Sequence, residues 1–356
     1  MTIKKLVESR ISRAINERVF PACVVGAVNK RGEKLVLPFG RFTYGKGSPQ
    51  VANDTIFDVA SITKAIPTSS LALKLIDEGK LQLESGLIDY LPEFGGSHRE
   101  EILIRHLLTL GLEFKLNNLS SYKNEAPDKI LERILKAGLA SPPGSTFLYT
   151  NSSSILLGLV IEKITKNTLD KTAAEYFFKP LKMERTTFSP LKRFSKDEIA
   201  PSEIDDWRGL VQGEVHDEST CALMKSDKTF GSAGLFSTVP DLLNFLEMLL
   251  NEGTLNGKRY FSPGIIKLMH TNQVEELGAC HGLGWELYQP QYMGQYCTKE
   301  TFGKTGFTGC VVICDIGKGI GMAMLSNTTY PKRKPLQEHV ALINAVRRDI
   351  ADIIFS

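Results

Sequence analysis

The sequence predicts an α+β fold: an antiparallel β-sheet flanked by N- and C-terminal helices, with a mostly helical inserted domain. Three observations predict it. Strand-like segments with hairpin turns occur near both ends of the chain, the stretch between them is helical in pattern, and helical apolar spacing marks both termini. Sequential hairpins imply antiparallel pairing. We expect residues 1–57 and 215–356 to form a sheet domain and residues 58–214 a helical domain, with an active site in the cleft between them.

The N-terminal part of the predicted sheet domain begins with a helix. Apolar residues at helical spacing predict that it ends near Arg18. Two strands are predicted at residues 21–28 and 34–37, and the turn residues at 29–32 join them as a hairpin.

The middle of the chain has few strand patterns. A helix is predicted from Ser61 to a stop at Gly79, and Pro67 should remove a backbone hydrogen bond and kink its first turns. Further helices are predicted at residues 105–110, 128–137, 152–165 and 169–178.

The C-terminal part returns to mixed character. A helix at residues 239–251 carries Pro240 and Asp241 in its first turn, where both residue types are favoured. Strands are predicted at residues 282–288, 311–315 and 320–325, the last two joined by a hairpin turn, and a final helix starts near residue 336.

Composition excludes several classes of partner and cofactor. With 43 Lys and Arg against 40 Asp and Glu, the net charge is +3, which is too small to favour nucleic acid or an anionic membrane as a partner. No apolar run approaches the ~20 residues of a membrane span, and charges interrupt the N-terminal segment, so we expect a cytoplasmic protein without signal peptide. The six cysteines lack zinc-ligand spacing, so we expect reduced, buried thiols.

Ser61-Ile62-Thr63-Lys64 places a hydroxyl and an amine three residues apart at the start of a helix, hence on one face. A serine hydroxyl is a weak nucleophile until a base takes its proton, and a lysine of suitably low pKa can serve as that base. The helix N-terminus also offers free backbone N–H groups for a developing oxyanion. Alone, this pattern is more typical of a capping serine with a solvated lysine.

Tyr149-Thr150-Asn151 follows a Pro-Pro-Gly turn and precedes a predicted helix. A phenol near two lysines can take part in general acid–base catalysis. The Asn151 carboxamide is a candidate for orienting Lys64 and a substrate amide. The alternative is structural: a core tyrosine followed by a helix-capping asparagine.

Lys304-Thr305-Gly306 lies just before the predicted strand at 311–315. Lys304 supplies a cation, and Gly306 allows a substrate backbone to approach closely. The preceding Gly303 makes the segment look like the end of a phosphate-binding loop. That loop needs a glycine where Thr298 stands, and its strand–loop–helix context is missing.

Together, in this order and spacing, Ser-x-x-Lys, Tyr-x-Asn and Lys-Thr-Gly resemble the active-site set of the serine β-lactamase and penicillin-binding-protein superfamily, of the class C β-lactamase and family esterase type. The surrounding sequence is similar as well. The similar stretches are residues 57–64, 78–81, 91–94, 105–109, 143–144 and 233–238. The resemblance covers roughly residues 10–350.

The resemblance implies a serine hydrolase with no metal or organic cofactor. Ser61 would be the nucleophile, and Lys64 and Tyr149 would handle the proton. The backbone N–H groups of Ser61 and Phe307 would form the oxyanion hole. Asn151, Lys304, Thr305 and Gly306 would bind a small-molecule ester, amide or β-lactam, and water would release the acyl group.

The sequence departs from the family pattern in three places. The loop after Thr109 is shortened to Leu110-Gly111-Leu112, which alters one wall of the cleft. Lys304 stands where many relatives carry histidine, which favours carboxylate-bearing substrates. His216, in Val-His-Asp-Glu, is a possible site residue, although a structural role is the stronger expectation.

Two other functions remain as alternatives. One is a catalytically silent relative that uses the cleft to bind a ligand or to act as a scaffold. The other is an α/β-hydrolase, which needs Gly-x-Ser-x-Gly, and the segment around Ser232 lacks that spacing. The sequence leaves open the acyl group, the leaving group, whether β-lactams are turned over, and the oligomeric state.

Overall fold

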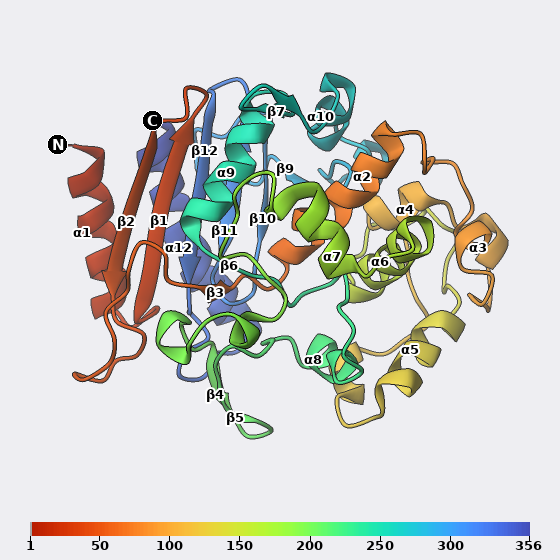
Figure 1. Cartoon of the computed structure of the whole chain (residues 1–356), viewed down its shortest axis with the longest axis horizontal. Helices are drawn as coiled ribbons and strands as arrows, with labels where there is room; N and C mark the ends of the chain where they lie inside the picture. The colour runs from red at the N-terminus through yellow and green to blue at the C-terminus, as the bar shows by residue number, and fades with distance from the viewer. Residues whose placement is uncertain (1) are drawn as a thin grey trace.

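A six-stranded antiparallel sheet forms the centre of the computed structural model, which describes residues 2–356 (Figure 1). Its strands, in spatial order, are β2 (Lys34–Gly40), β1 (Ala22–Asn29), β12 (Ile320–Ser326), β11 (Val311–Asp315), β10 (Thr301–Thr305) and β9 (Glu286–Leu287). β1 pairs with β12 so that Val25 lies opposite Met324, which joins the two ends of the chain. The predicted α+β fold with an antiparallel sheet is confirmed.

Apolar side chains alternate between the two faces of the sheet, as the period of two in a strand requires. Val311 and Ile313 of β11 pack in one core cluster, and Val312 and Cys314 pack in another. On one face lie α1 (Ile3–Asn16) and α12 (Leu336–Phe355), and on the other lies α9 (Val239–Leu250). The sheet is thus buried on both faces, which explains the nearly continuous apolar character of its central strands.

α9 approaches the sheet very closely at Gly26 of β1. A Cβ built on Gly26 would lie 2.4 Å from a methyl carbon of Val239, the first residue of α9. Only glycine therefore fits at this contact. α9 covers β1, β12 and β11, and it leaves the β10 and β9 side of the same face to the helical part of the chain.

Helices provide most of the regular structure between β2 and α9, and they pack beside the β10–β9 side of the sheet (Figure 1). The helices here are α2 (Ser70–Asp77), α3 (Leu87–Tyr90), α4 (Ile104–Leu108), α5 (Pro127–Lys136), α6 (Asn151–Thr165), α7 (Leu169–Ala173) and α8 (Glu218–Met224). Two-stranded pairs join β3 (Phe57–Asp58) to β6 (Phe236–Ser237) and β4 (Glu203–Asp205) to β5 (Gly209–Val211). The predicted domain boundaries at 57/58 and 214/215 stay a prediction.

The remaining elements follow α9. They are the β7 (Thr254–Leu255) and β8 (Lys258–Arg259) pair, α10 (Pro263–Met269) and α11 (Pro290–Met293). α11 packs against α12.

Strand prediction failed at two places beside the site. The strand predicted at 282–288 is reduced to β9, because Gly282 donates to the Trp285 carbonyl in a tight turn and Gly284 has a φ of +81°. β10 was not predicted at all, since Gly303 and Lys304 break the apolar pattern. Lys304 therefore lies within a strand, opposite Val312, and not in a loop before one.

Pro67 interrupts the helix after Ser61, as predicted. Ile66 has non-helical angles (φ −119°, ψ 108°), and a wide helical turn over Lys64–Ser69 leads into α2. No helix among residues 2–356 is long and apolar enough to cross a membrane. In the same residues, no group of three or more His, Cys, Asp or Glu could hold a metal ion, and all six cysteines are free.

Candidate active site

The segment that carries Ser61 is held by Asp58 at the end of β3. One carboxylate oxygen of Asp58 accepts from the backbone N–H of Ala60 at 2.8 Å, and the other accepts from that of His216 at 2.7 Å. Ala60 has a φ of +48°, a left-handed conformation that costs a non-glycine residue about 1 kcal/mol or more. The backbone thus turns sharply just before Ser61, which lines a pocket.

Lys64 is buried (4% exposed), and its amine contacts two oxygens. Its Nζ lies 2.9 Å from Ser61 Oγ and donates to the Ser232 carbonyl at 2.7 Å. The Ser232 carbonyl comes from the segment before β6, so the amine is fixed from two sides. The spacing of three residues has the geometric effect expected of it: hydroxyl and amine meet.

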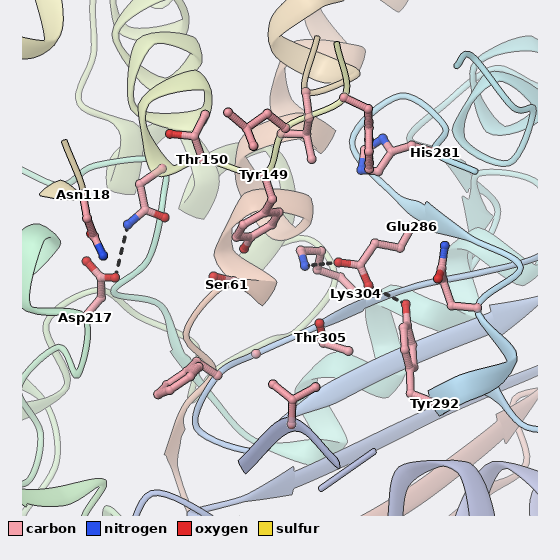
Figure 2. Close-up of a pocket in the computed structure, with 18 of the residues that line it drawn as sticks. Ser61, Asn118, Tyr149, Thr150, Asp217, His281, Glu286, Tyr292, Lys304 and Thr305 are labelled. Atoms are coloured by element: carbon pink, nitrogen blue, oxygen red, sulfur yellow. Dashed lines mark hydrogen bonds and ion pairs between the residues drawn. The ribbon is translucent and has the colours of Figure 1, made fainter. Parts of the chain in front are cut away.

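Tyr149 lies on the segment that leads into α6, with Ser61 and Lys304 nearby (Figure 2). Its ring centre is 5.1 Å from Lys64 Nζ and 4.9 Å from Lys304 Nζ. Burial of the phenol opposes its ionisation, but Lys304, Lys64 and the nearby Ser61 hydroxyl outweigh that effect and hold the Tyr149 pKa below its usual value. The phenol therefore ionises more easily than that of a free tyrosine. The residue as a whole is 47% exposed.

Lys304 forms an ion pair that the sequence did not indicate. Its amine contacts Glu286 Oε1, and Glu286 Oε2 accepts from the Tyr292 hydroxyl at 2.6 Å (Figure 2). Burial would lower the Lys304 pKa, yet the Glu286 carboxylate raises it above its usual value. Burial likewise opposes ionisation of Glu286, and Lys304 keeps its pKa low. The Glu286 carboxylate therefore favours the charged form of Lys304 and is already its ion-pair partner.

Asn151 begins α6, and its side chain contacts residues other than Lys64, the partner expected for it. Its amide nitrogen lies 3.2 Å from Asp217 Oδ2 and 3.3 Å from Ser219 Oγ. No hydrogen bond joins Asn151 to Lys64 within residues 2–356. Asn151, Asp217 and Thr305 all line the pocket, so Asn151 remains available to a substrate but does not directly orient Lys64.

Gly306 and Phe307 follow β10 and come close to the Ser61 segment. A Cβ on Gly306 would lie 2.4 Å from the Val59 carbonyl oxygen, so only glycine fits there. Among the hydrogen bonds of residues 2–356, none uses the backbone N–H of Phe307 or of Ser61. Both donors predicted for the oxyanion hole are thus unoccupied, and both residues line the pocket.

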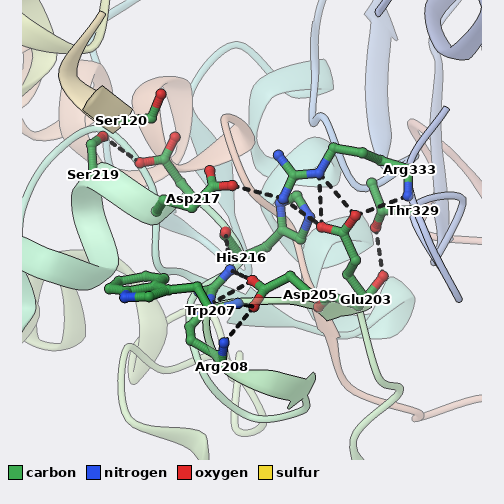
Figure 3. A network of polar contacts seen from close by, with 12 residues as sticks. Ser120, Glu203, Asp205, Trp207, Arg208, His216, Asp217, Ser219, Thr329 and Arg333 are labelled. Atoms are coloured by element: carbon green, nitrogen blue, oxygen red, sulfur yellow. Dashed lines mark hydrogen bonds and ion pairs between the residues drawn. The ribbon is translucent and has the colours of Figure 1, made fainter. Parts of the chain in front are cut away.

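His216 lies behind Phe307 and is not among the residues that line the pocket. Its ring stacks on the Phe307 ring with centres 5.8 Å apart, and its Nε2 lies 2.8 Å from Glu203 Oε2. Arg333 also binds Glu203, which completes the network in Figure 3. Burial opposes ionisation of Glu203, but His216 and Arg333 lower its pKa to about 2. His216 thus packs against the Phe307 ring from outside the pocket.

The pocket has a volume of about 790 Å³. Its lining residues come from the segment between Ser61 and Asp217 and from the C-terminal segment between Cys280 and Arg347. Its other polar lining residues include Asn118, His281, His339, Asn344 and Arg347. Burial lowers the His281 pKa to about 4, so this imidazole is neutral at neutral pH. Sequence reasoning missed His281, Glu286, His339 and Arg347, because each lies in no motif and reaches the site only through the pairing of distant segments.

A family model and curated relatives place this chain in one family. The model of the family described as "Beta-lactamase" matches residues 9–345. A putative D-alanyl-D-alanine carboxypeptidase of Escherichia coli K12 is 30% identical over 318 aligned residues, covering 79% of this chain and 72% of that protein. An N-acetylmuramyl-L-alanine amidase of Bacillus subtilis is 28% identical, covering 78% of this chain and 68% of that protein.

Solved structures show the same fold at lower identity. EstCE1, described as a hydrolase with promiscuous acyltransferase activity, has a TM-score of 0.77 at 20% identity, with 99% of this chain and 98% of that chain covered. An octameric penicillin-binding protein homologue from Pyrococcus abyssi has a TM-score of 0.72 at 23% identity, with coverages of 96% and 76%.

Proposed function

Because the chain belongs to the β-lactamase family, we propose that it is a serine hydrolase that forms an acyl-enzyme on Ser61. The observation that carries the proposal is the 2.9 Å contact between Lys64 Nζ and Ser61 Oγ, with the Tyr149 ring about 5 Å from the same amine. A nucleophile within hydrogen-bond reach of a base is the arrangement that acyl transfer needs. No metal or organic cofactor is required for this chemistry.

The proposed reaction has two halves. Ser61 Oγ attacks the substrate carbonyl, its proton passes to Lys64 or Tyr149, and the negative oxygen is bound by the N–H groups of Ser61 and Phe307. The leaving group takes the proton as the tetrahedral intermediate collapses to the acyl-enzyme. A water molecule then attacks the acyl carbonyl and gives its proton to the same base. Ser61 Oγ leaves and takes up a proton, and the acid is released.

We propose esters or amides of small or D-amino-acid-type acyl groups as the substrate class, with Asn151, Lys304, Thr305 and Gly306 as binding residues. The carboxypeptidase and amidase relatives support an amide substrate. The Lys304–Glu286 pair weakens the expectation of a carboxylate-bearing substrate, because the charge of Lys304 is already balanced. We also propose that the protein acts in the cytoplasm on a small molecule.

Covalent labelling tests this proposal directly. Intact-mass measurement after incubation with a fluorophosphonate or a penicillin should show one adduct, mapped to Ser61, and Ser61→Ala should show none. Hydrolysis of p-nitrophenyl butyrate should fall by about 10³-fold or more in Ser61→Ala. Adduct-free wild-type protein without esterase activity would support the ligand-binding or scaffold alternative.

A substrate panel then separates the members of the class. Short p-nitrophenyl esters, nitrocefin and D-alanyl peptides should be compared at equal enzyme concentration. An esterase turns over only the first, and a carboxypeptidase releases D-alanine. Adduct formation with nitrocefin but no turnover would identify β-lactams as inhibitors.

A further inference from the structure

The peptide between Gly306 and Phe307 has two ends with different surroundings. Its N–H, on Phe307, is the free donor proposed for the oxyanion hole. A peptide is planar and trans, so its carbonyl, on Gly306, points the opposite way. That carbonyl accepts from Gly309 N at 3.1 Å and from Arg347 Nη2 at 2.7 Å. Whatever holds this carbonyl also fixes the direction of the N–H.

Arg347 reaches this peptide from α12 and is buried (4% exposed). Its Nη2 also donates to the Cys310 carbonyl at 2.8 Å, and its Nη1 donates to Asn344 Oδ1 at 2.9 Å. Cys310 O in turn accepts from Gly306 N at 2.7 Å. One guanidinium thus bridges both ends of the turn from Gly306 to Cys310, and a change in its position would move the whole turn.

His339 holds the next carbonyl of the same turn. It lies two helical turns before Arg347 on α12, and its Nε2 is 2.8 Å from Phe307 O. A carbonyl only accepts, so Nε2 carries the proton. Burial lowers the His339 pKa, and Nδ1 is buried without a partner, as expected of the neutral ring. The His339 ring also packs on the Phe307 ring, with centres 4.6 Å apart.

Arg347 has no carboxylate partner among residues 2–356. A buried cation that binds only neutral oxygens is costly for folding, and an apolar side chain of similar size would be cheaper. Burial lowers its pKa to about 10, which still leaves it charged at neutral pH. The structure therefore keeps a positive charge directly behind the Gly306–Phe307 peptide.

We propose that Arg347 and His339 are positioning residues for the oxyanion hole: two side chains of α12 hold consecutive carbonyls so that the Phe307 N–H points at the reacting oxygen. The inference rests on the proposed function. Arg347 also polarises the peptide, because a charge-assisted bond to the carbonyl makes the N–H of the same amide a stronger donor. Such donors, fixed before the reaction, stabilise the charge that develops in it.

The test compares Arg347→Met with Arg348→Met. The two arginines are neighbours on α12, and Arg348 is half exposed and paired only with Asp349. With p-nitrophenyl butyrate, a neutral ester, Arg347→Met should lower kcat/KM by about ten- to hundredfold, and Arg348→Met should stay within about twofold. Arg347→Lys, which keeps the charge and can reach one carbonyl, should recover part of the loss.

A boronic acid separates positioning from general structural damage. Phenylboronic acid adds to a serine Oγ, and one oxygen of the tetrahedral adduct occupies the oxyanion position. Its affinity should fall in Arg347→Met by the same factor as kcat/KM. Unchanged boronate affinity, or a loss confined to an acidic ester such as mono-p-nitrophenyl succinate, overturns the proposal, and the latter makes Arg347 a substrate-binding residue instead.

His339→Phe provides a second variant if Arg347→Met does not fold. It keeps the ring contact with Phe307 and removes only the donor, so kcat/KM and boronate affinity should fall together by about three- to tenfold. Wild-type kcat/KM and wild-type boronate affinity in His339→Phe overturn the proposal. Ser61→Ala separates failure of the proposed function from failure of this inference. Retained activity in Ser61→Ala refutes the proposed function. Activity that depends on Ser61 but is fully kept in Arg347→Met refutes only this inference.

Discussion

The surroundings of Lys64 and of Lys304 differ, although both amines are buried and both lie about 5 Å from the centre of the Tyr149 ring. Lys64 contacts a hydroxyl and a carbonyl, and it has no ion pair among residues 2–356. Lys304 is paired with the Glu286 carboxylate, which raises its pKa. The same residue type is thus placed once where its proton can be shared with a nucleophile and once where its charge is fixed.

The difference suggests that the two lysines beside the Tyr149 phenol have different roles. Lys304 and Lys64 both lower the Tyr149 pKa, against the effect of burial, and Lys64 alone of the two also contacts the Ser61 hydroxyl. We expect Lys64 to be essential for proton transfer and Lys304 to set the pH at which transfer occurs. Three predictions test this division.

The largest effect is expected at Lys64. Lys64→Ala removes the amine next to Ser61 Oγ, so kcat/KM for p-nitrophenyl butyrate should fall by about 10³-fold or more. Lys74→Ala is the matched control, since Lys74 lies on α2 and pairs only with Glu78. A loss in Lys64→Ala no greater than in Lys304→Met would remove the distinction between the two lysines.

Tyr149→Phe should have the second largest effect. Without the hydroxyl, we expect a loss of about 10²-fold in kcat/KM, less than for Lys64→Ala, if Lys64 is the dominant base. Tyr288→Phe, at an exposed tyrosine outside the pocket lining, should have little effect. Equal losses in Tyr149→Phe and Lys64→Ala would mean that the two groups share the proton.

The smallest effect, and the most specific, is a shift in the pH profile. Lys304 lowers the Tyr149 pKa and Glu286 raises it, although burial is the largest influence. Lys304→Met should therefore move the limb of kcat/KM that reports phenol ionisation to higher pH. Glu286→Gln should move it to lower pH. Shifts in the same direction in both variants, measured from pH 6 to 10, would refute the role given to this ion pair.

The sequence indicated the reactive groups but not their partners. Ser61 and Lys64 meet because three residues of helix bring them together, a local relation that a motif records. Glu286 reaches Lys304 because β9 pairs with β10, with Gly303 opposite Glu286, and no local pattern encodes that register. Sheet pairing depends on side chains from distant segments, so Glu286 was invisible without the fold.

The fold itself was predictable where the apolar pattern is regular. β1, β11 and β12 are short, nearly continuous apolar runs next to turn residues, and α12 repeats with a helical period, so each was expected close to where it lies. β10 was missed because Gly303 and Lys304 interrupt its apolar pattern, and Lys304 is one of the residues that line the pocket. A candidate site residue thus concealed the strand on which it lies.

The pairing of β1 with β12 also has a consequence for how the molecule is made. β1 and β2 leave the ribosome early, yet the edge of β1 that Met324 covers stays open until nearly the entire chain has been synthesised. Open strand edges with apolar faces recruit other chains, and pairing across so long a sequence separation is slow. A chain stopped before residue 320 should therefore aggregate or require chaperones, rather than persist as a smaller folded protein.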